Sequence, residues 1–437
     1  MTGFGVRPLA LSIAVLCGLG ACRSKPEPGA PPRGPQPSDT ARDAASAAIP
    51  KAEPPRVDNV VLISVDALRA DQPWSGYTKA STPNLSHFAS TSIVYTQAYA
   101  VSNITMPALS GMLAGRYPTE IPRDTCIFGQ FKLDGSLVPT LKEAGVATLA
   151  VHGHALFAGI LAPKIGFDVW RLVRGVAGRL QTEGAVTGNE VADLLIDELK
   201  GLQDRGTRHF VWAHFVDPHD SYAKHKNFPP TSKSQRGLYD GEVAYTDAAI
   251  GRALDFLAQS DLSKNTAVIV ASDHGEAFGE HGTTRHGFSI YQEEIRVPLM
   301  LRIPGIAHRE IDKPRSAIDL APTIADLLRV KAPDGWRGVS LLKDLASSGP
   351  ADRTVIVDVP ENTERPQRWA VIVGSTKVAI EPGSVRVFDL KADPDEKTPL
   401  SGPEAGAAVG RAKTEIGALE YVKATKCMQV FVDGKDG

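Results

Sequence analysis

Short apolar runs alternate with amphipathic stretches along most of the chain. The runs are nearly continuous and rich in β-branched residues, as in strands that are buried on both faces of a sheet. We expect such strands at 59–65, 148–151, 209–215, 267–271 and 299–302. Helical periodicity lies between them, at 137–143, 191–202 and 242–258. This alternation predicts an α/β fold, a doubly wound mixed or parallel sheet with helices on both faces.

The pattern changes after about residue 342. Short apolar runs separated by Gly, Pro and Asn turns predict a small antiparallel sheet. Its strands are expected at 354–359, 369–373, 377–380 and 385–390, with a last helix near 409–422. We therefore predict a main domain at 57–342 and a C-terminal α+β subdomain at 343–437.

The N-terminus has the pattern of an export signal. Arg7 precedes an apolar run at 8–19 that is too short to span a bilayer. The sequence Leu-Gly-Ala-Cys at 19–22 resembles the lipobox of bacterial lipoproteins, although an ordinary signal peptide with a chance cysteine is an alternative. We expect 1–21 to be the signal peptide and Cys22 the lipidation site.

Residues 22–56 are rich in Pro and Ala and lack any apolar periodicity. Such a segment cannot bury an apolar face, so we expect a disordered linker. A diacylated Cys22 would hold the protein firmly at a bilayer. The expected location is therefore the cell envelope, at the outer membrane or at the periplasmic face of the inner membrane.

The net charge bears on the binding partners, and the cysteines bear on a possible disulfide. The formal net charge of -2, with no basic cluster, gives no field that would attract nucleic acid, so no nucleic-acid partner is expected. Two of the 4 cysteines, Cys126 and Cys427, lie beyond the export segment. A disulfide in an oxidising compartment and two free thiols are both open.

Acidic and imidazole side chains stand where two predicted strands end. Asp66 follows the first strand, and Asp273 with His274 follows the strand that ends at 271. Ligands of a divalent cation would meet at the carboxyl ends of these strands. Taken alone, each acidic residue is as readily explained as a helix N-cap.

Neighbouring segments sharpen this interpretation because together they resemble the sulfatase family. They are Val-Asp-Ala-Leu-Arg-Ala-Asp at 65–71, Thr-Pro-Asn-Leu at 82–85, Leu-Ala-Gly-Arg-Tyr-Pro at 113–118, Ser-Asp-His-Gly-Glu at 272–276, Glu-His-Gly at 280–282 and Arg-Val-Pro-Leu at 296–299. The likeness extends to about residue 394. It implies an alkaline-phosphatase-like fold in which Asp66, Asp273 and His274 bind one divalent ion, namely Ca, Mg, Mn or Zn.

The chain departs from the family at the nucleophile. The family makes formylglycine from the Cys or Ser of a Cys/Ser-x-Pro-x-Arg motif, which falls here on Thr105 to Leu109. Threonine is not converted by the known route, so no formylglycine is expected. Related phosphodiesterases and transferases use a threonine at this place, and we expect Thr105 to be both nucleophile and metal ligand. The simpler alternative is that Thr105 caps a helix that begins near Pro107.

Thr105 favours phosphoryl chemistry. A hydroxyl bound to a divalent ion can attack phosphorus in line, and water or an alcohol can then release the phosphothreonine. A sulfated formylglycine hydrate expels sulfate by collapsing to the aldehyde, whereas a sulfated threonine has no such exit. We therefore expect a phosphoester hydrolase or phosphoryl transferase.

Further side chains are candidates for the substrate contacts. By the resemblance, His219 would contact the ester anion, His286 would protonate the leaving oxygen, and Arg116 would orient the nucleophile loop. Bridging hydrogen bonds or a salt bridge are the simpler roles. Asp217, His219 and His286 are also candidates for a second metal. Weaker candidates are His281, His214 and His154.

Three functional hypotheses follow. The first is a metal-dependent hydrolase or transferase acting on an anionic ester of a glycan, a lipid or a small molecule. The second is a sulfuric ester hydrolase, similar to arylsulfatases, that works without formylglycine. The third is a catalytically silent surface protein that binds an anionic glycan or lipid, and loss of the predicted metal ligands would have favoured it.

Overall fold

The computed structural model describes residues 57–127, 129–157, 165–174, 186–202, 207–346 and 349–427. The predicted signal peptide, Cys22 and the linker at 22–56 lie outside these ranges. All of the described residues belong to one compact unit, Pro54–Gly437. None of the helices in the described ranges is long and apolar enough to cross a membrane.

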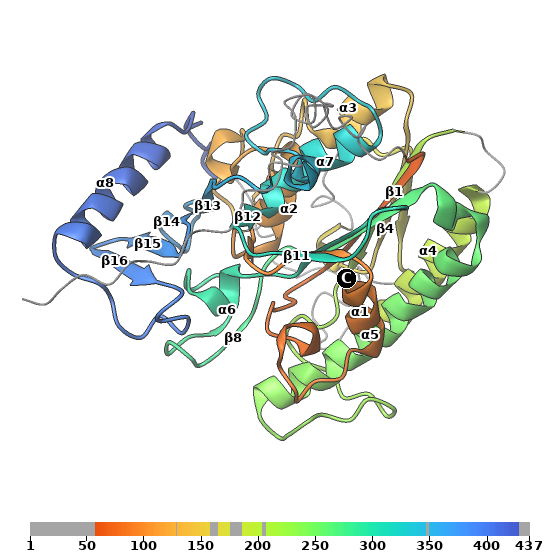
Figure 1. Ribbon diagram of the computed structural model, residues 1–437, viewed down its shortest axis with the longest axis horizontal. Coiled ribbons are helices and arrows are strands. Elements are labelled where there is room, and N and C mark those ends of the chain that lie inside the picture. The colour runs from red at the N-terminus through yellow and green to blue at the C-terminus, as the bar shows by residue number, and fades with distance from the viewer. Residues whose placement is uncertain are drawn as a thin grey trace, which may run out of the picture. The chain divides into compact units, whose positions relative to one another are not determined.

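An eight-stranded sheet forms the centre of the fold (Figure 1). Its order is β11 (Arg309–Ile311), β2 (Ile93–Tyr95), β10 (Leu299–Arg302), β7 (Thr266–Ser272), β1 (Asn59–Val65), β6 (His209–Phe215), β4 (Ala147–His152) and β5 (Val169–Leu172). The pairs are parallel except that β10 runs antiparallel to β7 and β2. The predicted mixed sheet is confirmed.

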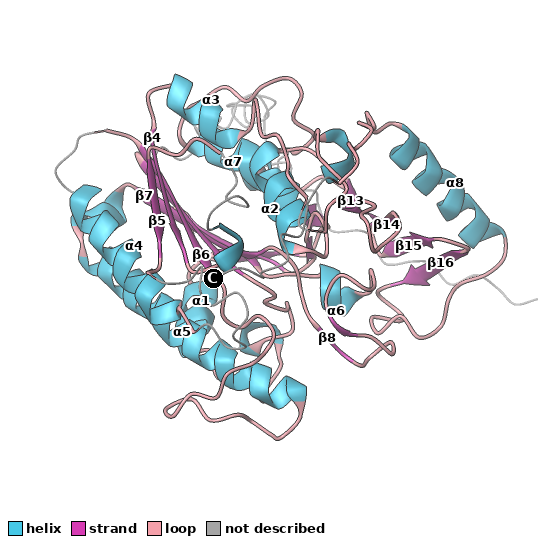
Figure 2. Cartoon of the chain, turned by 180° about the vertical axis from the view of Figure 1, so that it is seen from behind, coloured by secondary structure: helices cyan, strands magenta, loops and turns pink. Residues whose placement is uncertain are grey.

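Helices cover both faces of this sheet, as Figures 1 and 2 show from opposite sides. One face carries α1 (Pro83–Ser90), α4 (Gly188–Leu202) and α5 (Gln235–Gln259), and the other carries α2 (Thr105–Ala114), α3 (Leu137–Glu143) and α7 (Leu320–Leu327). Alternate residues of β1 serve the two layers: Val61 and Ile63 pack on the first side, and Val60 and Leu62 on the second. Their burial holds the carboxyl end of β1 in a fixed place.

The start of α5 differs from the prediction, which placed the helix at 242–258. The helix begins at Gln235, where the Ser234 side chain accepts a hydrogen bond from the N–H of Gly237 at 3.1 Å. Its first turns bury polar residues, including Asp240 and Glu242. Apolar periodicity alone therefore missed the turns before Glu242.

A second, antiparallel sheet follows in the chain. It consists of β13 (Thr354–Val359), β14 (Arg368–Val373), β15 (Thr376–Glu381) and β16 (Ser384–Asp389), in that order. Helix α8 (Pro403–Gly417) covers one face, as Figure 1 shows. The other face packs on Tyr99, Ile104, Ile290 and Ile295, next to the short helix α6 (Gln292–Ile295). The predicted last helix at 409–422 was wrong by about six residues at its start, because Pro403 begins α8 after Gly402.

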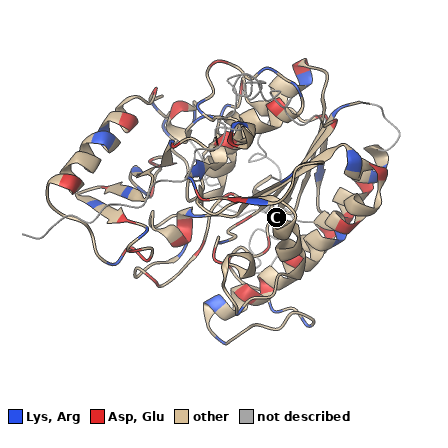
Figure 3. Ribbon diagram, in the orientation of Figure 1, with Lys and Arg blue, Asp and Glu red and all other residues tan. Residues whose placement is uncertain are grey.

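Small elements complete the fold. Two-residue strands form the pairs β12 (Arg315–Ser316) with β3 (Ala98–Tyr99) and β8 (Ala277–Phe278) with β9 (Thr284–Arg285). A disulfide joins Cys126 to Cys427, so the structure settles the alternative that the sequence left open. Basic and acidic residues are interspersed along the ribbons, including α4 and α8 (Figure 3).

Candidate active site

Two carboxylates meet at the carboxyl end of the central sheet. Val65 of β1 lies in register with Ser272 of β7, so the residues that follow them, Asp66 and Asp273, are neighbours. Both side chains are fully buried. Neither oxygen of Asp66 has a hydrogen-bond partner among the described residues, and Oδ2 of Asp273 has none either. Uncompensated burial of this kind is costly, and it marks a place where a ligand is needed.

The backbone around Asp273 fixes the direction of its free oxygen. Oδ1 accepts hydrogen bonds from the N–H groups of Ala67 at 3.2 Å and His274 at 2.9 Å. Ala67 has φ 55°, an unusual left-handed conformation for a residue other than glycine. That turn brings its N–H to Asp273, and Oδ2 is left to face the imidazole of His274.

The ring of His274 has a defined tautomer. Its Nδ1 lies 2.9 Å from the carbonyl oxygen of Gly275, which can only accept, so Nδ1 carries the hydrogen and Nε2 presents a lone pair. Nε2 lies 3.4 Å from Oδ1 of Asp66 and 3.5 Å from Oδ2 of Asp273. Two carboxylate oxygens and the lone pair of an imidazole nitrogen thus face one another. A divalent cation resolves this conflict, and oxygen ligands with one imidazole suit Ca, Mg, Mn or Zn.

Thr105 adds a hydroxyl to the same group. Its Oγ1 lies 3.2 Å from Nε2 of His274. Thr105 is the first residue of α2, a helix whose residues are all buried. The helix N-terminus favours negative charge near this hydroxyl. Asp66, Asp273, His274 and Thr105, predicted as ligands of one metal, therefore come together in the structure.

The buried charges shift one another's pKa. Burial raises the pKa of Asp66, but His219, His214 and His274 outweigh it and hold the pKa below its usual range. Burial and the charge of Asp66 raise the pKa of Asp273 well above its ordinary value. The pKa of His274 falls to about 3, mainly through burial. A neutral His274 is the form that binds a metal.

A second group of potential ligands, Asp66, His154 and His219, shares the first carboxylate. Nδ1 of His154 accepts the N–H of Leu156 at 2.9 Å, so in the neutral ring the hydrogen sits on Nε2. Nε2 lies 3.4 Å from Oδ2 of Asp66, a contact that is electrostatic and not a hydrogen bond. His154 therefore supports the carboxylate and is a poor metal ligand.

His219 and His286 lie side by side, with ring centroids 4.9 Å apart. Nδ1 of His219 donates to the carbonyl of Asp220 at 2.6 Å, so Nε2 faces the site. Burial lowers the pKa of His219, but Asp66 and Glu276 outweigh it, and the net shift is upward. Burial lowers the pKa of His286 to about 3. Between them, the two rings can hold one proton.

Several predicted residues lie elsewhere. Oδ2 of Asp217 accepts the N–H of Thr187 at 3.1 Å, and among the described residues Asp217 forms no metal group with His219 and His286, so the proposed second-metal trio is not supported. Arg116 follows the far end of α2, about 15 Å of helix from Thr105, and donates to the carbonyl of Asp134 at 3.2 Å. The orienting role predicted for Arg116 does not fit this position.

The weaker histidine candidates have separate roles. Nδ1 of His214 lies 2.8 Å from Oγ of Ser64, and its Nε2 is 3.5 Å from Oδ2 of Asp66, so His214 flanks the carboxylate. His281 lines a cavity outside the metal group, where it bridges Glu293 at 2.7 Å and the carbonyl of Asp395 at 3.0 Å. His281 thus has a structural role.

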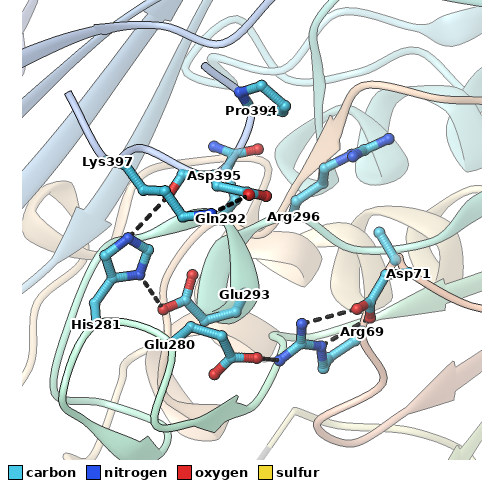
Figure 4. A pocket seen from close by; sticks show the side chains of 11 residues that line it. Arg69, Asp71, Glu280, His281, Gln292, Glu293, Arg296, Pro394, Asp395 and Lys397 are labelled. Atoms are coloured by element: carbon cyan, nitrogen blue, oxygen red, sulfur yellow. Dashed lines mark hydrogen bonds and ion pairs between the residues drawn. The ribbon is translucent and has the colours of Figure 1, made fainter. Parts of the chain in front are cut away.

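That cavity is drawn in Figure 4. Arg69 pairs there with Asp71 at 2.8 Å and with Glu280 at 2.6 Å. Figure 4 shows Arg69 between Asp71 and Glu280, and His281 turned toward Glu293, so most of the charge is already compensated. Arg69 also donates to the carbonyl of Glu276 at 2.7 Å. The cavity therefore supports the neighbouring loop of the site and presents little unpaired charge.

Sequence reasoning missed two carboxylates that hold the site. Oε1 of Glu276 lies 3.1 Å from Nδ1 of His286. Glu294 accepts hydrogen bonds from Asn103, at 2.9 Å, and from three consecutive N–H groups at 287–289. It therefore ties the loop after His286 to the segment before Thr105. The only signal in the sequence was the place of Glu276 within the 272–276 motif.

Comparisons with known proteins point to one family. The family model described as Sulfatase matches residues 58–330. The chain is 31% identical to Arylsulfatase K of Gallus gallus over 239 residues, which is 50% of this chain and 44% of that protein. It is 23% identical to the ulvan-active sulfatase of Formosa agariphila over 410 residues, 80% and 78% of the two chains. The chain thus spans less than half the length of the Gallus gallus relative.

Solved structures share the fold. The complex of Ps i-CgsB with k-i-k-neocarrahexaose superposes with a TM-score of 0.70 at 18% identity, covering 83% of this chain and 93% of the other. The phosphonate monoester hydrolase of Agrobacterium radiobacter gives 0.63 at 19% identity, covering 83% and 95%. At these identities the likeness shows the fold alone.

Proposed function

Because the chain belongs to the Sulfatase family, we propose that it is a metal-dependent hydrolase or transferase of phosphate or sulfate esters with Thr105 as nucleophile. One observation carries this proposal. Both oxygens of Asp66 and Oδ2 of Asp273 are buried without hydrogen-bond partners among the described residues, and Nε2 of His274 beside them lies 3.2 Å from Oγ1 of Thr105. Burying these polar atoms without a bound ligand would be energetically costly, so their burial indicates a ligand site.

The roles of the residues follow from their positions. A divalent ion, when bound by Asp66, Asp273 and His274, would favour ionisation of the hydroxyl and offset charge on the ester. Thr105 forms the new bond to phosphorus while the bond to the leaving oxygen breaks. His219 and His286 hold the proton that the leaving oxygen takes up. Water, or an acceptor alcohol, then attacks phosphorus and releases Thr105.

Phosphoesters are the favoured substrates. A phosphorylated threonine can be discharged by attack at phosphorus, whereas a sulfated threonine cannot collapse to an aldehyde. Hydrolysis of sulfate esters is the second candidate, since the relatives above are named as sulfatases. The natural substrate is an anionic ester of a glycan, a lipid or a small molecule.

The test is turnover of 4-nitrophenyl phosphate, bis(4-nitrophenyl) phosphate and 4-nitrophenyl sulfate by the full chain with Zn, Mn, Mg or Ca added. We expect phosphoester turnover that Thr105→Ala abolishes. Thr414→Ala, on the exposed side of α8, is the matched control and should leave turnover unchanged. Turnover of the sulfate alone would establish the second candidate, and turnover that survives Thr105→Ala would refute the mechanism.

We also infer that the protein is a lipid-anchored protein of the cell envelope. The lipobox-like segment at 19–22 supports this, and the disulfide between Cys126 and Cys427 suits an oxidising compartment. In a bacterial host, Cys22→Ser should abolish labelling by radioactive palmitate and release the protein from the membrane fraction. Unchanged labelling in that variant would contradict the anchor.

A further inference from the structure

An arginine of the C-terminal sheet lies at the edge of the candidate active site. Arg365 belongs to the loop between β13 and β14. A Cβ added at Gly287 would lie 2.5 Å from Nη1 of Arg365 and 3.1 Å from Cγ1 of Ile104. Gly287 directly follows His286, and Ile104 directly precedes Thr105. The guanidinium therefore approaches the site from the side of His286.

The loop presents Arg365 in a fixed way. The N–H of Arg365 donates to Oδ1 of Asn362 at 2.9 Å, and the N–H of Asn362 donates back to the carbonyl of Arg365 at 2.9 Å. The guanidinium lies over the ring of Phe288, 4.3 Å from its centroid. Phe288 is 46% exposed, which is unusual for a large apolar side chain beside a buried site.

The charge of Arg365 is not compensated. Within the described ranges, its guanidinium has no hydrogen bond to a carboxylate or carbonyl and no ion pair, only the aromatic contact. Arg368, on the same hairpin, differs because its Nη1 donates to the carbonyl of Gly287 at 3.2 Å and it faces Glu381 at 3.9 Å. Arg285 likewise pairs with Asp220 at 3.0 Å. Arg365 is thus available to an anion from outside the chain.

Two other features indicate that a ligand could bind beside Arg365. Gly287 has φ 82°, and any side chain there would displace Arg365. The rings of His286 and His274 are 4.2 Å apart, so the subsite continues directly into the metal group. A cation and an exposed aromatic face, both next to His286, match a ring that bears a negative charge.

We propose that Arg365 and Phe288 form a specificity subsite for the organic part of the ester, which rests on the function proposed above. The substrate class is an ester whose leaving group is a ring with a second anionic substituent. The ring lies against Phe288, and the guanidinium of Arg365 donates to the substituent. The scissile group lies at Thr105.

A matched pair of esters tests this subsite. The full chain is assayed with 3-carboxyphenyl phosphate and with 3-carbamoylphenyl phosphate, which differ only in the charge of the substituent. We expect Arg365→Gln to raise KM for the carboxylated ester about tenfold with kcat within about twofold, and to leave the carbamoyl ester unchanged. Arg365→Lys should recover part of the loss. Arg411→Gln, an exposed arginine of α8, is the control.

The outcomes separate this inference from the proposed function. An equal change for both esters in Arg365→Gln, or no change for either, would overturn the subsite while catalysis by Thr105 stands. If wild type hydrolyses neither ester, calorimetric binding of 3-hydroxybenzoate and 3-hydroxybenzamide replaces the assay. Preference for the benzoate that Arg365→Gln removes would support the subsite, and its absence would overturn it. Thermal unfolding of each variant verifies folding.

Discussion

Two buried carboxylates from distant parts of the chain, Asp66 and Glu294, have opposite surroundings. Asp66 is fully buried, and neither oxygen has a hydrogen-bond partner among the described residues. Glu294 is as deeply buried, but it accepts hydrogen bonds from Asn103, from the N–H groups of 287–289 and from Oγ of Ser289. The first carboxylate receives no hydrogen bond from the described residues and has histidines nearby, whereas the second receives several, although burial still raises the pKa of Glu294 to about 8. Burial alone does not identify a functional site, whereas the absence of donors does.

The largest expected effect on activity comes from Thr105, the proposed nucleophile beside the carboxylates that lack hydrogen-bond donors. Thr105→Ala should lower phosphoester turnover at least about a thousandfold, because the attacking oxygen is removed. Thr105→Ser keeps a hydroxyl and should retain measurable activity. Thermal unfolding should change little in either variant. Steady-state kinetics with the best metal measures the loss, and comparable activity in Thr105→Ala would show that another group attacks.

The compensated carboxylate should affect stability most. Glu294→Gln replaces an acceptor oxygen by an amide that donates toward N–H groups, so we expect the free energy of unfolding to fall by about 2 to 4 kcal/mol. Metal affinity should persist, since Glu294 touches none of the proposed ligands. Urea unfolding measures the change, and Glu404→Gln on exposed α8 is the control. If Glu294→Gln were as stable as wild type, the hydrogen bonds to Glu294 would not stabilise the fold, and the contrast with Asp66 would not hold.

Glu242 offers an intermediate case. It accepts one N–H, from Ala223 at 3.2 Å, and lies 3.5 Å from His225, and burial raises its pKa to about 7. The native state therefore holds this proton more tightly than the unfolded chain does. Stability should fall by about 2 kcal/mol as the pH rises from about 4.5 to about 7. Urea unfolding across this range should show a flatter profile for Glu242→Gln; an unchanged profile would place the proton elsewhere.

The smallest expected effect has the opposite sign. Without metal, Asp273→Asn should raise the free energy of unfolding by about 1 to 2 kcal/mol, because burial and the charge of Asp66 raise the pKa of Asp273 and so disfavour its charged form. With metal present, the same variant should lose the stabilisation that wild type gains from binding. Unfolding with and without a chelator measures both. A loss of stability in metal-free Asp273→Asn would mean that the charge of this carboxylate is compensated after all.

The sequence predicted the parts of the fold and site that depend on local pattern. The apolar runs of β1 and β7 placed Asp66, Asp273 and His274 at strand ends, and the order of motifs placed Thr105 beside them. The roles predicted for Arg116 and Asp217 depend on distances across the fold, and the contacts of these side chains among the described residues do not support them. Sequence alone could not show that Arg116 lies at the far end of α2.

The roles of Glu294 and Arg365 could not be predicted from the sequence, for a related reason. Glu294 acts through donors on two separate segments, Asn103 and residues 287–289, and only the folded chain brings these together. Arg365 lies in a loop of the C-terminal hairpin, about 80 residues beyond Gly287, and its place depends on packing of that sheet against Ile104. Tertiary contacts of this kind leave no periodic signal in a sequence.

The most direct measurement is the metal content and metal affinity of the full chain and of Asp273→Asn, by elemental analysis and titration calorimetry. We predict about one tightly bound divalent ion per wild-type chain and its loss in Asp273→Asn, with Asp261→Asn, an exposed aspartate, unchanged. Wild type that binds no divalent ion, or an Asp273→Asn variant that binds as wild type does, would contradict the metal site on which the proposed function rests.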